Sequence, residues 1–573
     1  MLLKENTFNK NKFVKMFIAN IIGWIIVLLS EYFDSFLAGN LINADALAAL
    51  EIVTPLEYIM YACAMVTGFS VGILYSRELG NHNKLLSKQI AGMSLIVSFI
   101  GACLLAVLFY IIAPLYVSFF NCSANVSQYA ISAIRCLIYS FPIIFIYYDV
   151  YHLVTYDGNE TIILINDIAL VIFTILIPYL MTMRIGMAGI YYAYIVTYSL
   201  GTLLLLPHFF SKRNSISFKP YFSFKFLIEM FKLSFSTLLT NVYIFIVDVI
   251  FNAIIVKKFG DGVLPAYTIV NLLLNTAECL TATMTGAQIF ISTYYGEKSY
   301  KSIRRVMKMV YKYTFILAII LSIVCIIIAP YWPEIFAIEN ELAITYAKFA
   351  GYVIPSTYLF SALVYTFQNY YPNVDKPQYA NNIATLYMFL TPMAICLPLV
   401  YLFGFEAMII GFALTPVFTV LIMYAYFKLT KKKDIPLFLP ESDNIEIHHD
   451  LYLVDEDICE VKDLIFDELR KYDINQNIAQ EACIVAEDTL MYIKNKNRKK
   501  TLAEITILFD TKCLSLIVKD NGKIFDLVEA VKDADSLRAY TIDCLTNDTF
   551  VRENDVAISF NRNMYSWKLK ENA

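Results

Sequence analysis

Several acidic residues lie in or at the edges of long apolar segments of the chain, where an ionised side chain needs a partner or a function; besides the four candidates described next they include Glu51, Glu57, Asp149 and Asp167. Glu31 and Asp34 are three residues apart, so both carboxylates fall on one face of a helix. Asp248 and Glu278 lie in two later apolar segments. Two neighbouring carboxylates in a low-dielectric site cannot both stay ionised without a bound cation or proton. These residues are therefore candidates for binding H⁺ or Na⁺; the alternative is structural ion pairing or a place at the membrane interface.

The segments that hold these acids have the composition of membrane-spanning helices. The sequence has 573 residues, of which 58% are hydrophobic and 16% charged, far more apolar than a soluble chain. Apolar runs of about 20 residues, long enough to cross a hydrocarbon core of about 30 Å as helices, follow one another up to residue 427. About twelve spans are predicted, at residues 13–34, 51–75, 89–113, 129–152, 161–182, 187–208, 227–256, 264–294, 310–330, 343–367, 381–403 and 405–427.

Basic residues gather beside alternate ends of these spans, so the clusters fall on one side of the membrane. Arg77 follows the second span and Lys298 the eighth, whereas Lys257 and Lys258 are an exception on the other side. Lys and Arg are retained on the cytoplasmic side, which predicts a multi-pass protein of the cytoplasmic (inner) membrane with both termini in the cytoplasm. The eleven cysteines lack metal-ligand spacing, so neither a metal site nor a disulfide framework is predicted.

The predicted lobes resemble each other at an offset of about 217 residues, as expected for a duplicated six-helix unit. Gly80 aligns with Gly296, and Pro142 with Pro355. Both halves begin on the same side, so the repeat is parallel. The predicted fold is an all-α membrane protein of two six-helix repeats with a small cytoplasmic α+β domain.

The predicted organisation follows from this repeat and from a change of composition after Lys428. It comprises an N-terminal tail (1–12), a first lobe (13–209), an inter-lobe linker (210–226), a second lobe (227–430), a second linker (431–444) and a cytoplasmic domain (445–573), here called the tail domain.

Asp34 also begins a long pattern of glycine and proline residues. The run from Asp34 to Gly39 is followed by Leu47-Ala48-Ala49 and by a second segment with Pro55, Gly68, Gly72, Arg77 and Gly80. This pattern resembles the first two helices of the MATE (multidrug and toxic compound extrusion) family, and the resemblance covers roughly residues 10 to 430. Glycines at this spacing let helices approach closely, and a proline frees a backbone carbonyl. The motif residues are therefore predicted to be structural.

The resemblance implies a secondary antiporter that exports organic, often cationic, compounds in exchange for H⁺ or Na⁺. It implies that Asp34, with Glu31, forms the cation site of the first lobe. The asparagine and aspartate that many members carry in the fifth helix fall near Phe173 and Ile177, which cannot bind a cation, and the family's seventh-helix glutamate falls near Phe245. The coupling ion is therefore left open.

The tail domain is predicted to contain helices at 454–471 and 477–494 and strands at 504–509, 513–519 and 556–560. A seven-residue run from Asp520 to Asp526, at the end of a strand, resembles the adenine-binding box of GHKL ATPases, the fold of anti-sigma-factor kinases. The nucleotide-binding residues that this resemblance implies are Glu487, Asp520, Gly522 and Asp526.

Two departures indicate a degenerate nucleotide site. Met491 stands where the family has a magnesium-binding asparagine, and a thioether is unsuited to a cation that takes oxygen ligands. Ser536 stands where a phosphate loop needs glycine. The tail domain is expected to bind ATP or ADP weakly or not at all and to regulate or dock. No enzyme activity and no required cofactor are predicted.

Two other functions stay open at this point. One is a flippase for a lipid-linked oligosaccharide, which shares the repeat architecture, and the other is a membrane sensor that signals through a kinase-like tail. No nucleotide-binding loop of primary pumps is present in the sequence. The expected partners are the lipid bilayer, small organic substrates and a cytoplasmic regulatory protein at the tail domain, with no nucleic acid.

Overall fold

The computed structural model describes residues 7–569 except 43, 82, 119–123, 212–213, 215, 217, 220, 260–262, 336–337, 339, 431–435, 440–444, 453–457, 473, 498–500, 510–512, 524–536, 547–550 and 558–559. Asp526, Ser536 and most of the predicted linker 431–444 lie outside these described residues. Glu31, Gly39 and Pro55 belong to helices, but their surroundings are also outside the described part.

The first half of the helical unit follows the predicted spans closely. Its helices are α1 (Thr7–Leu37), η1 (Ala38–Ile42), α2 (Ala44–Gly80), α3 (Lys84–Ser118), α4 (Ala124–Leu137), η2 (Ile138–Ser140), α5 (Phe141–Tyr156), α6 (Glu160–Ile185), α7 (Met187–Leu205) and η3 (Leu206–Phe210).

The second half contains more breaks. Its helices are α8 (Phe224–Phe259), α9 (Leu264–Glu278), α10 (Thr281–Gly296), α11 (Tyr300–Ile328), η5 (Ala329–Tyr331), α12 (Trp332–Ile335), α13 (Glu341–Val353), η6 (Pro355–Thr357), α14 (Tyr358–Tyr370), η7 (Tyr371–Val374), α15 (Pro377–Thr385), η8 (Leu386–Leu390), η9 (Pro392–Cys396), α16 (Leu397–Leu402) and α17 (Phe405–Thr430). Proline at the start of a segment explains several breaks, because it removes a backbone donor. Pro142 and Pro355, aligned by the repeat, both adjoin a short 3₁₀ segment.

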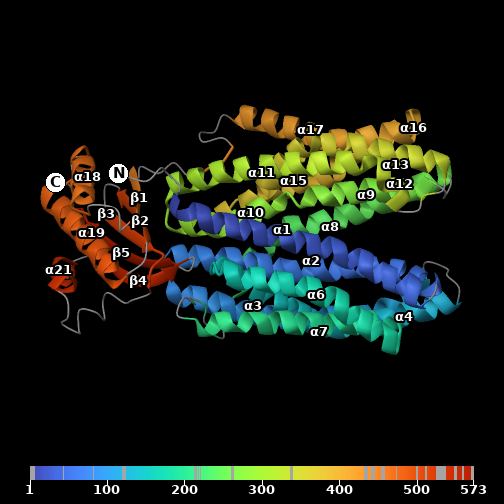
Figure 1. Ribbon diagram of the computed structural model, residues 1–573, viewed down its shortest axis with the longest axis horizontal. Coiled ribbons are helices and arrows are strands. Elements are labelled where there is room, and N and C mark those ends of the chain that lie inside the picture. The colour runs from blue at the N-terminus through green and yellow to red at the C-terminus, as the bar shows by residue number, and fades with distance from the viewer. Residues whose placement is uncertain are drawn as a thin grey trace.

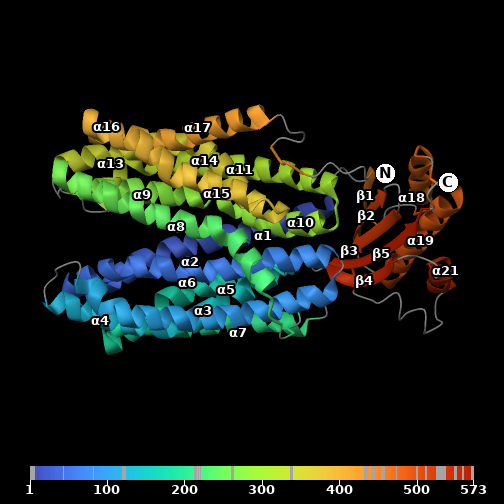
Figure 2. The same ribbon diagram turned by 180° about the vertical axis from the view of Figure 1, so that it is seen from behind.

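The helices form two layers. Figures 1 and 2 show α2 to α7 in one layer and α8 to α17 in the other, with α1 along their boundary. The layers meet where α2 packs against α8 and α10 and where α1 packs against α10. The tail domain lies at one end of the bundle, which also holds the start of α1 (Figure 1). This end is called the tail end below.

Within the described residues, eight helices are long and apolar enough to cross a membrane, and a bent pair in α8 would make nine. The other three predicted spans coincide with α1, with α9 and α10, and with α13 and α14. The last two are interrupted, at residues 279–280 and at Pro355, which explains why neither forms one continuous apolar helix.

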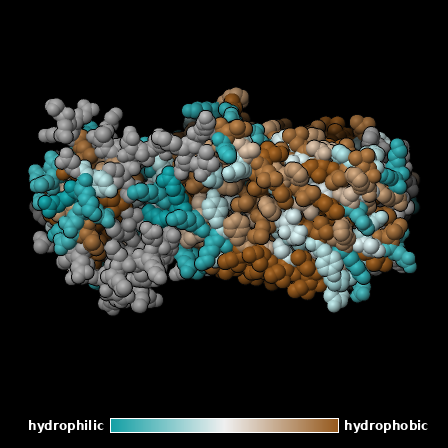
Figure 3. Space-filling model, turned by 90° about the horizontal axis from the view of Figure 1, so that it is seen from above, coloured by the Kyte–Doolittle hydropathy of each residue, from teal (hydrophilic) through white to brown (hydrophobic). Residues whose placement is uncertain are grey.

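The outside of the bundle is apolar, as lipid contact requires. Hydrophobic residues cover the bundle surface in Figure 3, whereas hydrophilic residues gather over the tail domain and at the opposite end. On α3, Leu104, Ile111 and Leu115 recur at helical spacing and are well exposed, Leu115 to 75%. A stripe of this kind would be buried in a soluble protein. Its exposure therefore marks the surface that faces lipid.

The two lobes touch closely at the tail end, where α2 and α10 both finish in glycine. A Cβ atom on Gly80 would lie 3.1 Å from Gly296 Cα and would clash with the Thr293 carbonyl oxygen. A Cβ atom on Gly296 would lie 3.0 Å from Gly80 Cα and would clash with the Arg77 carbonyl oxygen. The Arg77 side chain also crosses between the lobes, since its Nη1 lies 3.3 Å from Glu229 Oε1 and 3.4 Å from Asp375 Oδ1.

The tail domain contains one antiparallel sheet and three described helices. Its elements are β1 (Ile445–Tyr452), α18 (Ile458–Arg470), α19 (Gln476–Lys496), β2 (Leu502–Phe509), β3 (Cys513–Asp520), α21 (Leu537–Thr546), β4 (Val551–Ala557) and β5 (Phe560–Lys568). The strand order is β1-β2-β3-β5-β4, and every neighbouring pair is antiparallel. Helix and strand residues share one apolar core, and burial in it raises the pKa of the Cys483 thiol to about 12.

The structure corrects two strand predictions in the tail domain. Strand β1 was not predicted, because its sequence mixes charged residues and histidines with only alternate apolar side chains. The predicted strand at 556–560 is instead the place where the chain reverses, since Ala557 of β4 pairs with Phe560 of β5. The local pattern of β-branched and aromatic residues does not reveal a reversal of direction.

The close contact between the lobes predicts the effect of a small substitution. Gly80→Ala should lower the free energy of unfolding of the helical unit by about 1 to 3 kcal/mol, because overpacking a tight contact typically costs that much. Thermal unfolding in detergent measures the loss. Gly101→Ala is the matched control, since nothing lies within 4 Å of the Cβ atom it adds. Equal unfolding midpoints for the two variants would contradict the contact.

Candidate functional site

In the first lobe, Asp34 belongs to a buried group of two carboxylates and a tyrosine. Asp34 lies in the last turns of α1 and is 6% exposed. The Tyr194 hydroxyl on α7 lies 2.8 Å from Asp34 Oδ2 and 3.2 Å from Glu57 Oε2 on α2. A tyrosine hydroxyl has one proton and can donate to only one carboxylate at a time. Two carboxylates around one hydroxyl form a site that favours a shared proton or a small cation.

Tyrosines line the interior beside this group. The ring centroids of Tyr194 and Tyr198 are 6.4 Å apart, those of Tyr147 and Tyr198 5.1 Å, and those of Tyr61 and Tyr148 6.3 Å. The Tyr198 hydroxyl lies 3.3 Å from the Tyr61 hydroxyl. Aromatic faces attract organic cations, and the nearby carboxylates add charge of the opposite sign. The first lobe thus places aromatic faces next to carboxylates.

A second polar group lies in the same lobe, on α6. The Asp167 carboxylate is 2% exposed and accepts a hydrogen bond of 3.3 Å from the Tyr151 hydroxyl. Asn166 accepts a hydrogen bond of 2.8 Å from the Tyr147 hydroxyl and donates one of 2.7 Å to the Gly201 carbonyl oxygen. Because Tyr147 also belongs to the tyrosine group, these polar side chains and the Asp34 group share one aromatic interior.

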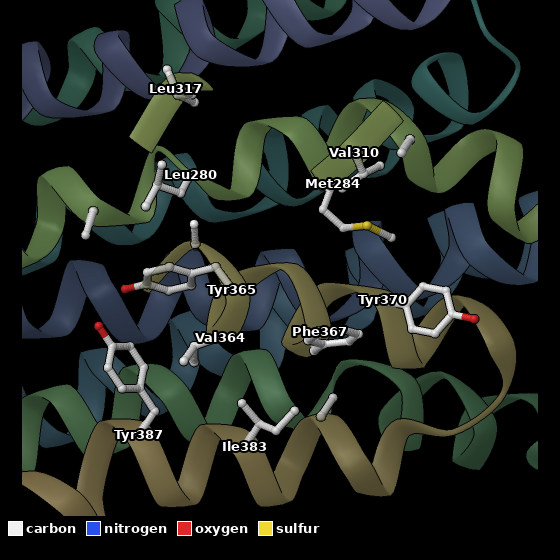
Figure 4. Close-up of a cluster of buried hydrophobic side chains, with 14 of the residues drawn as sticks. Leu280, Met284, Val310, Leu317, Val364, Tyr365, Phe367, Tyr370, Ile383 and Tyr387 are labelled. Carbon is white, nitrogen blue, oxygen red and sulfur yellow. The ribbon is translucent and has the colours of Figure 1, made fainter. Parts of the chain in front are cut away.

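In the second lobe, Asp248 and Glu278 line the same cavity. This cavity has a volume of about 70 Å³, and Asn271, Asn275 and Tyr365 also line it. The Tyr267 hydroxyl donates a hydrogen bond of 3.1 Å to Asp248 Oδ1. Figure 4 shows Tyr365 and Tyr387 with their hydroxyl groups on the same side of the apolar core, and both residues line the cavity. Oxygen ligands from two acids and two amides suit H⁺ or a small cation.

The candidate acids therefore fall into two groups, one per lobe. Asp248 and Glu278 line one cavity, and Asp34 shares a tyrosine hydroxyl with Glu57, an acid that the sequence places in an apolar span but that is not among the four candidate site residues. The sequence does not report that Glu57 and Asp34 meet at one hydroxyl. Phe173 packs against the apolar core and Phe245 is 48% exposed, so neither residue adds a ligand.

Two of the motif glycines, Gly68 and Gly72, lie at close contacts between helices. A Cβ atom on Gly68 would lie 2.7 Å from the His152 ring, and one on Gly72 would clash with the Tyr156 ring. Both contacts join α2 to α5. Close approach of these two helices therefore needs residues without side chains at these positions.

The residues that resemble a nucleotide site in the tail domain have protein partners. Asp520 is fully buried and accepts two hydrogen bonds. The Gly522 backbone N–H donates to its Oδ1 at 2.8 Å, and the Asn561 side-chain amide donates to its Oδ2 at 3.0 Å. Glu487 forms an ion pair of 3.0 Å with Lys462 on α18. Met491 packs against the apolar core of the tail domain. Asp526 lies outside the described residues.

The comparisons with known proteins agree with this architecture. The chain matches the family model MatE over residues 20–180 and 234–395, one match in each lobe. No curated protein matches it by sequence. Among solved structures it is similar to a MATE protein in complex with MaL6, with a TM-score of 0.68, 14% identity, and coverage of 74% of this chain and 96% of that chain.

Two further solved structures have the same fold. One is the Vibrio cholerae MATE transporter VcmN in the bent form, with a TM-score of 0.67, 15% identity, and coverage of 73% of this chain and 96% of that chain. The other is a MOP superfamily transporter from Pyrococcus furiosus, with a TM-score of 0.67, 14% identity, and coverage of 74% of this chain and 96% of that chain.

Two helical lobes with buried acids, a lipid-facing surface and this likeness define a multi-pass membrane transporter. The family match covers more than half of the sequence, so the chain belongs to the MatE family.

The tyrosine between the first-lobe carboxylates gives a direct test of this site. Tyr194→Phe should lower the free energy of unfolding by about 1.5 to 3 kcal/mol, the usual worth of a hydrogen bond to a charged group. Thermal unfolding in detergent at neutral pH measures the loss. Tyr179→Phe is the control, since Tyr179 is 38% exposed on α6. Equal losses in the two variants would show that the Asp34 contact is not made.

Proposed function

We propose that this protein is a secondary antiporter that exports organic cations across the cytoplasmic membrane in exchange for H⁺ or Na⁺. The observation that carries the proposal is the grouping of carboxylates with tyrosines inside each lobe. An acid that alternately holds a substrate cation and a coupling ion exchanges one for the other, because both compete for the same negative charge. The tyrosines add affinity for organic cations.

The orientation in this proposal rests on charge. Arg77, Lys298 and Lys301 lie at the tail end, which is therefore assigned to the cytoplasm by the positive-inside rule. Lys258, one of the basic pair in the last turn of α8 at the opposite end, donates to the Val400 carbonyl at 2.7 Å and to the Tyr401 carbonyl at 2.8 Å. It thus satisfies the end of α16, which gives this exception a local structural reason.

The position of the lobe contact supports an alternating-access cycle. In transporters built from repeats, one lobe rocks against the other around a site near the middle of the membrane. Here the lobes touch closely through Gly80 and Gly296 at the tail end. If the tail end is cytoplasmic, this contact corresponds to a conformation closed towards the cytoplasm, and export requires the lobes to part there before substrate enters.

The first-lobe acid should be indispensable for coupling. In proteoliposomes with an imposed proton or sodium gradient, Asp34→Asn is expected to reduce gradient-driven efflux of a cationic dye at least about tenfold, because the amide cannot bind a proton or balance a cation. Asp248→Asn should reduce it in the same direction. Glu406→Gln is the control, since Glu406 is exposed at the start of α17. Full efflux by Asp34→Asn would overturn the assignment.

For the tail domain we propose a regulatory or docking role without ATP hydrolysis. The support is the apolar Met491 in the core and the use of Asp520 in contacts within the domain. The purified full-length protein is expected to release no phosphate from ATP and Mg²⁺ above the background of a Glu487→Gln variant. Magnesium-dependent hydrolysis that this substitution abolishes would overturn the proposal. Micromolar, magnesium-dependent ATP binding would show that Met491 does not prevent metal binding.

A further inference from the structure

Three charged residues form a row across the sheet of the tail domain. Glu504 of β2 pairs with Lys519 of β3, which pairs with Arg562 of β5. Side chains alternate between the two faces of a strand. The sequence neighbours Ile505 and Val518 belong to the apolar core under the tail helices, so the charged row lies on the opposite face.

This charged row contacts the ends of both lobes. The guanidinium of Arg562 donates two hydrogen bonds. Its Nη1 donates to Oε1 of Glu297, the residue after α10, at 2.9 Å, and its Nη2 donates to the Leu79 carbonyl oxygen at the end of α2 at 2.8 Å. Lys519 Nζ donates 2.7 Å to Glu297 Oε2. One arginine therefore binds a residue of each lobe, directly beside the contact between Gly80 and Gly296.

A second set of contacts adds to this network. The Tyr294 hydroxyl on α10 lies 3.1 Å from both Glu504 carboxylate oxygens, and Lys519 Nζ lies 4.5 Å from the centre of the Tyr294 ring. Apolar contacts continue the interface, since Leu502 and Phe560 of the tail domain belong to the same apolar cluster as the helical unit. The tail domain is thus docked on the bundle through both charge and packing.

The burial of this network makes it sensitive to any single change. Glu504 and Arg562 are fully buried, and Lys519 is 1% exposed. With Glu297 they place two positive and two negative side chains in contact, so each charge has a partner of opposite sign. A buried ion network loses this balance when one member is removed, because the remaining charge stays uncompensated in a low dielectric. The planar fork of arginine also matters, because two separate nitrogens bind Glu297 and the Leu79 carbonyl, whereas the single nitrogen of a lysine would have to reach both.

We propose that the tail domain is a latch that holds the two lobes together at the tail end, and that the lobes part there only when its sheet releases α2 or α10. The proposal rests on the proposed function in one respect, that the lobes part at this end during transport. Glu297 and Leu79 belong to different lobes, so one guanidinium cannot hold both once they separate. Any signal that loosens the tail domain would then favour opening.

Distances between the lobes test the latch in the full-length protein. The native cysteines are replaced, and spin labels are placed at Leu85 on α3 and Lys301 on α11, one in each lobe and both exposed. The labelled protein with Arg562 and Glu297 intact should give mainly one short distance between the two labels. Arg562→Met and Glu297→Gln should each raise the population of a longer distance at least about tenfold, because an uncompensated buried charge strongly disfavours the docked state. Arg562→Lys should fall between.

Matched controls keep the result interpretable. Arg470→Met removes an exposed arginine from α18 and should leave the distances unchanged. If Arg562→Met fails to fold, Glu297→Gln tests the same contact from outside the tail domain. An unchanged short distance in Glu297→Gln would overturn the latch. The measurement needs neither substrate nor gradient, so a protein that exports nothing would still report on the latch.

Discussion

The contact between Gly80 and Gly296 is the constraint on which the rest of the structure depends. Two helices from different lobes end there with their backbones touching, and a side chain on either glycine would push them apart. Charged residues then surround the contact, with Arg77 reaching Glu229 and Asp375 on one side and Arg562 of the tail domain on the other. A small backbone contact can be made or broken with little loss of packing, which suits the proposed parting of the lobes at this end.

Within the lobes, the acids are arranged so that each repeat carries its own group of carboxylates. Asp34 and Glu57 face one tyrosine hydroxyl, and Asp248 and Glu278 share a cavity with two asparagines. A carboxylate in an apolar interior favours binding a proton or a cation, and neighbouring tyrosines favour an organic one. The acids lie inside the lobes and the glycine contact lies at their ends, so in the proposed cycle binding and opening would involve different parts of the molecule.

The tail domain distinguishes this chain from a transporter built of two lobes alone. Its sheet carries opposite charges in register across three strands, and their partners lie on both lobes. The run from Asp520 to Gly522, which resembles a nucleotide box, lies at the end of the strand that carries Lys519. Asp520 directly follows Lys519, so a conformational change in this turn would act on the residue next to a docking contact. The resemblance to an ATPase fold and the docking role therefore concern the same strand.

The sequence by itself determined the membrane class, the approximate spans and the repeat, and it selected Asp34 as a candidate, because apolar length, glycine spacing and acids within apolar segments are local properties of the chain. It also indicated Asp248 and Glu278, though not that they share a cavity. Pairing across the sheet, the reversal between β4 and β5, and the partners Glu57 and Tyr194 depend on residues far apart in the chain, which local patterns do not report. The docking of Arg562 onto Glu297 was decided only by the tertiary structure, since a charged residue in a strand reads as exposed until its partner from another domain is placed against it.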